Sequence, residues 1–164
     1  MVVFRSRNDD SAFIVLSDEV REHVCGHFGE GVPGSRFVMQ SPDVLLQMVL
    51  DEFPDAISGA VAEADGRKRV SVKFPDVIGE CNVVDWSQLT EEERNTMHTV
   101  ARGQSEVRCV ESRRRFPTSE CQLVLSDDNH LITVYPGEAA PPLPSVGQTG
   151  DSYWNSHVFV VQRG

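Results

Sequence analysis

Two histidines four residues apart, His23 and His27, and a third near the other end of the chain, His157, are well suited to chemistry. Imidazole titrates near neutral pH, so a histidine can serve as a general acid, a general base or a metal ligand. On a helix, His23 and His27 would lie one above the other on the same flank. The metalloprotease pattern His-Glu-x-x-His is absent, because Val24 follows His23. The alternative is a pair of partly packed or solvent-facing histidines, with His157 a satisfied core residue at the mouth of a strand.

A basic cluster is the second candidate site. Five arginines and only two glutamates lie between residues 102 and 115 of a chain whose formal net charge is −10. Guanidinium groups bind phosphate through paired hydrogen bonds. Arg108 lies between Val107 and Cys109 in an alternating pattern that predicts a shielded position. For the run Arg113–Arg115, the alternative to phosphate binding is a solvated hairpin tip.

Two hydroxyl residues, Thr133 and Tyr135, are two positions apart in a predicted strand and would share one face of it. Their hydroxyls could serve a site, although threonine and tyrosine are also common in strands. No glycine-rich dinucleotide motif, phosphate-binding loop or Gly-x-Ser-x-Gly elbow occurs in the sequence. Nucleotide-dependent phosphoryl transfer and α/β-hydrolase chemistry therefore have no support.

Composition limits the partners. The 164 residues, of which 40% are hydrophobic and 24% charged, fit one ordinary globular domain. Fifteen basic against 25 acidic residues disfavour a protein that coats DNA or anionic membranes. The sequence contains neither a transmembrane run nor a secretory leader, so we expect a cytoplasmic protein. The four cysteines form no Cys-x-x-Cys pair, which predicts reduced thiols in the core and no zinc site.

Two helices are expected to position these residues. The first begins at Ser17, which is a good N-cap before Asp18 and Glu19, and it is short because glycines follow. The second begins with Ser41 and Pro42 and ends at Pro54. Its expected inward face is Leu45, Leu46, Val49, Leu50 and Phe53.

Strands follow the helices. Alternation predicts strands over residues 67–74, 77–86, 104–110, 120–125, 130–135 and 157–162. We expect the first two to pair through a turn at 74–76 and the middle two to form a hairpin through 126–129. A capping-box pattern at 90–93 predicts a short helix. The expected fold is α+β: one domain over residues 1–164, with an N-terminal helical layer at about 14–63 packed on an antiparallel sheet at about 67–162.

Four stretches of the chain, read together, resemble bacterial nuclease-toxin domains. They are Ser17–His27, Gly79–Val84, Arg108–Ser119 and the closing region from Leu131 to Val158, which includes Thr133-Val134-Tyr135-Pro136-Gly137, an Ala-Pro-Pro loop and Trp154-Asn155-Ser156-His157. The group is the barnase/EndoU/colicin-tRNase/RelE-like ribonuclease superfamily, especially its phage-associated and polymorphic-toxin branches. The similar blocks extend over about residues 14 to 162.

The resemblance implies RNA cleavage without a metal or cofactor, by attack of the 2′-hydroxyl on the adjacent phosphorus. Such chemistry needs a base, an acid and a donor for the developing charge. The resemblance casts His27, with His23 as its alternate, and His157 as the acid/base candidates. It also implies that Arg108 binds the phosphate and that the Thr133 hydroxyl donates to a phosphoryl oxygen. Tyr135 is the supporting candidate. RNA, with tRNA among the candidates, is the implied substrate.

Two other functions stay open from the sequence. Members of the superfamily are often basic, whereas this chain is acidic, and Cys109 and Val134 depart from the motifs. A relative that kept the fold, lost cleavage and binds a protein partner is the main alternative. The third hypothesis is a metal site that contains His23, His27 and a distant cysteine or histidine.

Overall fold

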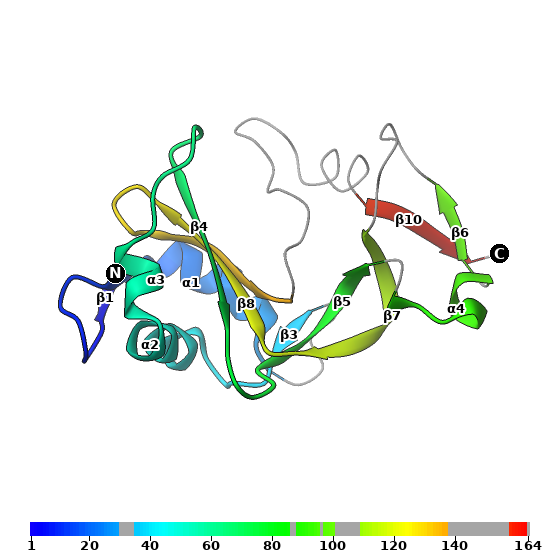
Figure 1. Ribbon diagram of the computed structural model, residues 1–164, viewed down its shortest axis with the longest axis horizontal. Coiled ribbons are helices and arrows are strands. Elements are labelled where there is room, and N and C mark those ends of the chain that lie inside the picture. Colours follow the sequence, from blue (N-terminus) through cyan, green and yellow to red (C-terminus); the bar gives the residue numbers. More distant parts are fainter. Residues whose placement is uncertain (30–34, 86–87, 96, 101–108, 138–157, 164) are drawn as a thin grey trace. The chain divides into compact units, whose positions relative to one another are not determined.

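The computed structural model describes residues 1–29, 35–85, 88–95, 97–100, 109–137 and 158–163 (Figure 1). Contacts divide the chain into two compact units, the first made of residues 1–81 and 117–138 and the second of residues 82–116 and 139–164. Helices occur together with mainly antiparallel strands, which confirms the α+β class. The single domain over residues 1–164 stays a prediction.

The first unit begins with a strand hairpin and not with a helix. β1 (Val2–Arg5) pairs antiparallel with β2 (Phe13–Leu16), and Val3 lies opposite Val15. Strands therefore precede the helices, contrary to the expected order, and residues 14–16 belong to a strand. β2 is a short, continuous apolar run, and such a run carries no periodicity that distinguishes a buried strand from a helix.

The first helix forms as expected. α1 (Asp18–Val24) follows Ser17, whose hydroxyl accepts a hydrogen bond from the Val20 N–H at 3.2 Å. This bond satisfies one of the donors that a helix start leaves without an intrahelical partner. The α-helix ends at Val24, and a 3-10 turn, η1 (Cys25–His27), continues the chain.

The second helix presents most of the expected face to the core, but Phe53, the last residue expected on that face, follows the helix as its C-cap and is only half-buried. α2 (Pro42–Glu52) has proline in its first turn, and the side chains of Leu45, Leu46, Val49 and Leu50 are fully buried. α2 ends just before Pro54, as expected, and Pro54 itself begins a second short helix, α3 (Pro54–Ser58). Proline fits the first turn of a helix, where no intrahelical partner exists for its missing N–H.

Three strands form an antiparallel sheet in the order β4-β8-β9. β4 (Arg67–Lys73) pairs with β8 (Glu120–Ser126), which in turn pairs with β9 (Leu131–Pro136). The expected hairpin at 126–129 joins β8 to β9, with Asn129 at φ 64°. Asparagine tolerates this left-handed conformation better than most residues do.

The expected pairing of β4 with the next strand is wrong. β5 (Gly79–Asp85) lies antiparallel to β3 (Arg36–Phe37) instead, with Glu80 opposite Arg36. Alternation in the sequence fixes which side chains share a face, but it does not fix which strand becomes the neighbour.

One hydrophobic core holds the first unit together, and it contains residues from the hairpin, the helices and the three-stranded sheet (Figure 1). Its buried members include Ile14, Leu16, Val24, Leu45, Leu46, Val49, Leu50, Val70, Val72, Leu123, Leu125, Leu131 and Val134. The side of the sheet that carries Val70, Leu123 and Val134 therefore belongs to the core. The residues that alternate with these along each strand lie on the opposite side of the sheet.

The second unit contains α4 (Glu91–Asn95), β6 (Met97–Val100), β7 (Cys109–Thr118, whose last two residues belong to the first unit) and β10 (Val158–Arg163). The Thr90 hydroxyl accepts from the Glu93 N–H at 3.1 Å, as the capping pattern predicts. β10 pairs antiparallel with β6 but parallel with β7. The expectation of an antiparallel sheet therefore does not hold for the pairing of β10 with β7.

Two further expectations concern this unit. The run Arg113–Arg115 lies within β7, so its interpretation as a hairpin tip is wrong. The greater part of the strand expected at 104–110 lies outside the described residues, and β6 was not predicted. None of the helices in the described part has the length and apolar character needed to cross a membrane.

Candidate functional site

Four of the six predicted site residues lie in the described part of the chain, and all four belong to the first unit. His23 is exposed on α1, and His27 is half-buried in η1. Thr133 and Tyr135 lie on β9. Arg108 and His157 lie outside the described residues. Because α1 ends at Val24, the two nearby histidines do not share the flank of one α-helix as the spacing predicts.

Thr133 and Tyr135 share one face of β9, as alternation predicts. Val134 between them is fully buried in the core, whereas both hydroxyl residues are half-buried. The strand register places Tyr135 opposite Gln122 of β8, and Gln122 opposite Ser71 of β4. These three residues form a polar row across the sheet, on the side away from the core.

Gln122 holds this polar row in place through two side-chain hydrogen bonds. Its side-chain amide donates to the Ser71 hydroxyl at 3.0 Å and to the Gly137 carbonyl at 3.0 Å, and only 8% of the residue is exposed. Both amide hydrogens are therefore used within the protein. No described residue forms a hydrogen bond with the hydroxyl of Thr133 or with that of Tyr135. These hydroxyls remain available to a ligand.

Burial also affects the ionisation of this face. The pKa of the Tyr135 phenol is raised above its ordinary value, mainly by burial, with a smaller contribution from the neighbouring Cys81 thiol. The phenol therefore stays protonated near neutral pH and acts as a hydrogen-bond donor. A protonated donor is suited to stabilising negative charge on a ligand oxygen.

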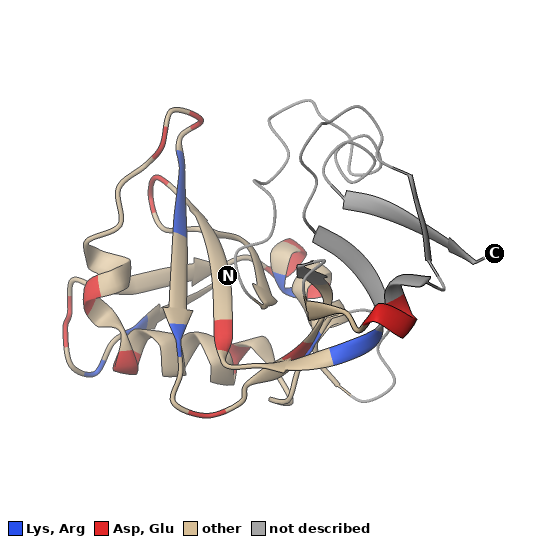
Figure 2. Cartoon of the chain, turned by 45° about the vertical axis from the view of Figure 1, so that its right-hand side comes forward, with Lys and Arg blue, Asp and Glu red and all other residues tan. Residues whose placement is uncertain are grey.

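One of the two arginines on this face of β4, Arg69, already has ion-pair partners. Arg69, which the register places two residues along β4 from Ser71, forms ion pairs with Glu63 and with Asp65, the latter at 2.7 Å. The hydrogen bond with Asp65 raises the pKa of Arg69, and the same contact lowers the pKa of Asp65. Its Nε is buried and has no hydrogen-bond partner in the described part of the chain. Figure 2 shows the basic residues of β4 with acidic turns close to one end of the strand.

The Arg69 guanidinium is therefore not the strong phosphate ligand of this face, because two carboxylates already neutralise it. If the chain binds phosphate through an arginine, the sequence candidate is Arg108, which the structure does not describe.

His27 has one ring nitrogen fixed by the backbone. Its Nδ1 lies 3.2 Å from the Ser35 carbonyl oxygen. Since a carbonyl only accepts hydrogen bonds, Nδ1 must carry the proton, and the lone pair of the neutral ring then lies on Nε2. No hydrogen bond occupies Nε2 among the described residues. This tautomer leaves a nitrogen that can accept a proton.

A chain of contacts connects His27 to the polar row. The Ser35 hydroxyl donates to the Cys81 thiol at 3.5 Å. Cys81 in turn packs so closely against Gly137 that a Cβ on that glycine would lie 2.6 Å from the sulfur. The Gly137 carbonyl accepts from Gln122. Residues far apart in sequence are thus held in one contiguous region of the first unit.

The residues in this region that sequence reasoning missed are Ser71, Gln122, Ser35 and Cys81. Only Gln122 left a signal: it is an amide between Cys121 and Leu123, in a strand that is otherwise buried. The partners of all four depend on strand neighbours that local sequence does not specify.

The prediction of a buried thiol holds for Cys81 and Cys121 and is wrong for Cys25, which is exposed.

Metal binding gains no support from the part of the chain that is described. No group of three or more histidine, cysteine, aspartate or glutamate side chains there is arranged to hold an ion. The hypothesis of a metal at His23 and His27 therefore lacks a third ligand among these residues.

Comparisons with known proteins do not identify the chain. No family model matches it, and no curated protein and no solved structure matches it either. The functional conclusion therefore depends on the geometry of the chain's own residues.

Proposed function

We propose that this chain is a metal-independent, ribonuclease-like domain in which His27 is the general base. The observation that carries the proposal is the hydrogen bond between His27 Nδ1 and the Ser35 carbonyl, because it leaves Nε2 as the basic nitrogen. A general base needs both a lone pair at the reacting atom and a partner that orients the ring.

In the proposed reaction, His27 Nε2 takes the proton from the RNA 2′-hydroxyl while that oxygen attacks the adjacent phosphorus. The bond to the 5′-oxygen breaks, and a 2′,3′-cyclic phosphate forms. His157 is the proposed acid that returns a proton to the leaving 5′-oxygen, and Arg108 is the proposed phosphate ligand. The hydroxyls of Thr133 and Tyr135 would donate to the phosphoryl oxygens, where negative charge develops.

The proposal also includes the layer arrangement, the substrate and the cellular location that the sequence analysis expects. The helices α1 to α3 would form one layer against the β4-β8-β9 sheet, the substrate would be an RNA such as tRNA, and the protein would act in the cytoplasm. The core that α2 and this sheet share supports the layer arrangement.

Cleavage of labelled tRNA by the full chain in excess EDTA tests the proposal. We expect the His27→Ala variant to lose activity by about 10²- to 10⁴-fold, the usual contribution of a general base. The matched control is His23→Ala, which removes an exposed histidine from the same segment and should cleave within about twofold of the wild type. Absence of wild-type cleavage, or equal activity of the two variants, would refute the proposal.

A non-catalytic protein-binding module is the second candidate function. The observation that favours it is the neutralisation of Arg69 by Glu63 and Asp65, which weakens the attraction of this sheet face for RNA. If this function is correct, affinity capture with the full chain recovers a protein partner, and His27→Ala captures it equally well. Robust cleavage in EDTA that depends on His27 would exclude it.

A further inference from the structure

A groove on the outer side of α2 is separate from the region described above. Val44 and Met48 are one helical turn apart and form its apolar part; Val44 is 49% exposed. Gln47 and Asp51, one turn apart on the same helix, also line the groove, and so does Arg7 from the turn after β1.

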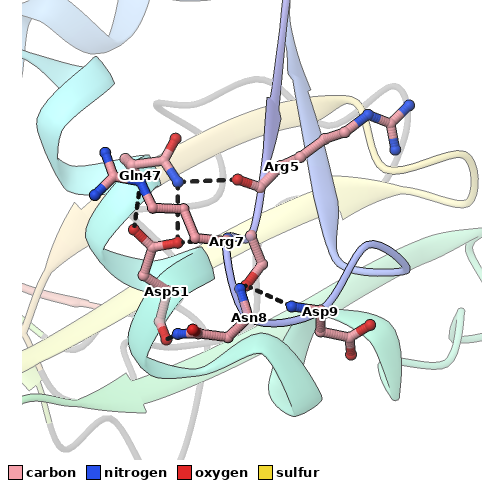
Figure 3. Close-up of polar contacts among 7 residues, drawn as sticks. Arg5, Arg7, Asn8, Asp9, Gln47 and Asp51 are labelled. Atoms are coloured by element: carbon pink, nitrogen blue, oxygen red, sulfur yellow. Dashed lines mark hydrogen bonds and ion pairs between the residues drawn. The ribbon is translucent and has the colours of Figure 1, made fainter.

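The wall formed by Asp51 and the hairpin is fixed by hydrogen bonds. Asp51 Oδ1 accepts from the Arg7 backbone N–H at 2.8 Å and from Gln47 Nε2 at 3.1 Å. The Asp51 carbonyl accepts from the Asn8 side-chain amide, and Gln47 also donates to the Arg5 carbonyl (Figure 3). The hairpin is thereby fastened to α2, and the groove has a defined shape.

The second oxygen of the same carboxylate is held much less firmly. Asp51 Oδ2 lies 3.8 Å from Arg7 Nε, and the Arg7 side chain is 80% exposed. An exposed ion pair of this kind contributes little to stability, because water screens it and the side chain loses rotamer freedom. A guanidinium or ammonium group from another molecule could replace Arg7 at this oxygen at low cost.

Acidic side chains dominate the groove. Asp43, Asp51 and Glu52 line it against the single cation Arg7. Asp43 also forms an ion pair with Arg21 of α1, whereas exposed Glu52 has no ion pair in the described chain. The groove therefore combines an exposed apolar patch with an excess of carboxylates, which is complementary to a basic segment that carries an apolar side chain.

We propose that this groove binds a basic peptide segment of a partner protein. An apolar side chain of the peptide would cover Val44 and Met48. One cationic group would replace Arg7 at Asp51 Oδ2, and a second would pair with Glu52. The net charge of −10 would speed the encounter with such a segment. This binding does not depend on the proposed ribonuclease activity.

Fluorescence anisotropy with the full chain tests the proposal. The probe is a fluorescein-labelled ten-residue peptide in which two central leucines are flanked by arginines, and the comparison peptide has glutamates in place of the arginines. We expect the arginine peptide to bind and the glutamate peptide not to bind. Glu52→Gln should weaken binding by about two- to fivefold, the effect of one exposed charge pair, and Val44→Ser should also weaken it.

Matched controls separate the groove from general charge attraction. Asp127→Asn removes the same charge from the exposed β8–β9 hairpin, and Val77→Ser removes a comparably exposed valine; neither should change the affinity. Arg7→Ala should strengthen binding because it removes the internal competitor. Failure of the arginine peptide to bind, an equal loss in Asp127→Asn and Glu52→Gln, or weaker binding by Arg7→Ala would overturn the proposal.

Discussion

Replacing Gly137 by alanine should destabilise the first unit strongly. Gly137 follows β9 with φ 128°, a conformation that residues with a Cβ rarely adopt. The strain of such a backbone for alanine costs about 1–3 kcal/mol. The new Cβ would also lie 2.6 Å from Cys81 Sγ, which is closer than real Cβ contacts. Overpacking of this kind costs about 1–3 kcal/mol, so the expected loss is about 2–6 kcal/mol.

Gly66→Ala is the matched control. Gly66 also has a positive φ, 79°, but nothing lies within 4 Å of the position that its Cβ would occupy. This variant should lose only the strain contribution of about 1–3 kcal/mol. The difference between the two variants therefore reports the contact between Gly137 and Cys81 together with the extra backbone strain of the larger φ at Gly137.

Urea unfolding of the full chain, followed by circular dichroism, measures both losses. Combining Gly137→Ala with Cys81→Ala should recover about 1–2 kcal/mol relative to the sum of the single variants, because the sulfur is no longer in the way. Equal losses for Gly137→Ala and Gly66→Ala, with no coupling to Cys81, would refute this packing and with it the connection from Ser35 to Gln122.

Three further results are expected. Ser17→Ala removes the N-cap hydrogen bond of α1 and should lower the free energy of unfolding by about 1 kcal/mol in the same urea assay. Iodoacetamide should modify exposed Cys25 in the folded protein and leave Cys121 unmodified, because Cys121 is fully buried and its pKa is raised by burial; mass spectrometry identifies the modified thiol. The lowered pKa of Asp65 beside Arg69 implies stability that is fully present above the ordinary value of 3.8 and is lost as the pH falls through the lower folded-state value. Acid titration followed by circular dichroism should accordingly show a weaker dependence in Asp65→Asn, and an unchanged dependence would count against the ion pair.

Local signals predicted the local elements of this fold well. A serine–proline start and apolar residues at helical spacing identified α2 and four of its five buried residues. The hairpin at 126–129 followed from turn residues between two alternating segments. Each of these features is decided by residues close together in the sequence.

Strand partners were not predictable in the same way. β4 pairs with β8 from the far part of the chain and not with β5, which follows it directly. β2 was missed because its four residues are too few to show a period. The run Arg113–Arg115 is polar, yet it belongs to a strand of ten residues, since pairing along a strand can override the local preference of its side chains.

The candidate site shows the same difference between features set by local sequence and features set by distant strand partners. The shared face of Thr133 and Tyr135 follows from the two-residue period of a strand, and it was predicted. The bond of Gln122 to Ser71 joins residues 51 positions apart, and it exists only because β4 and β8 are neighbours. The orientation of His27 depends on the Ser35 carbonyl, whose position no side-chain pattern encodes.

The most direct test of the proposed chemistry compares two substrates in EDTA: a labelled RNA that the chain cleaves and the same RNA with a 2′-deoxy sugar at the cleaved position. If the 2′-hydroxyl is the nucleophile, the ribose substrate gives a product that ends in a 2′,3′-cyclic phosphate, and the 2′-deoxy substrate stays intact. Cleavage of the 2′-deoxy substrate, or a ribose product that carries no 2′,3′-cyclic phosphate, would contradict the account.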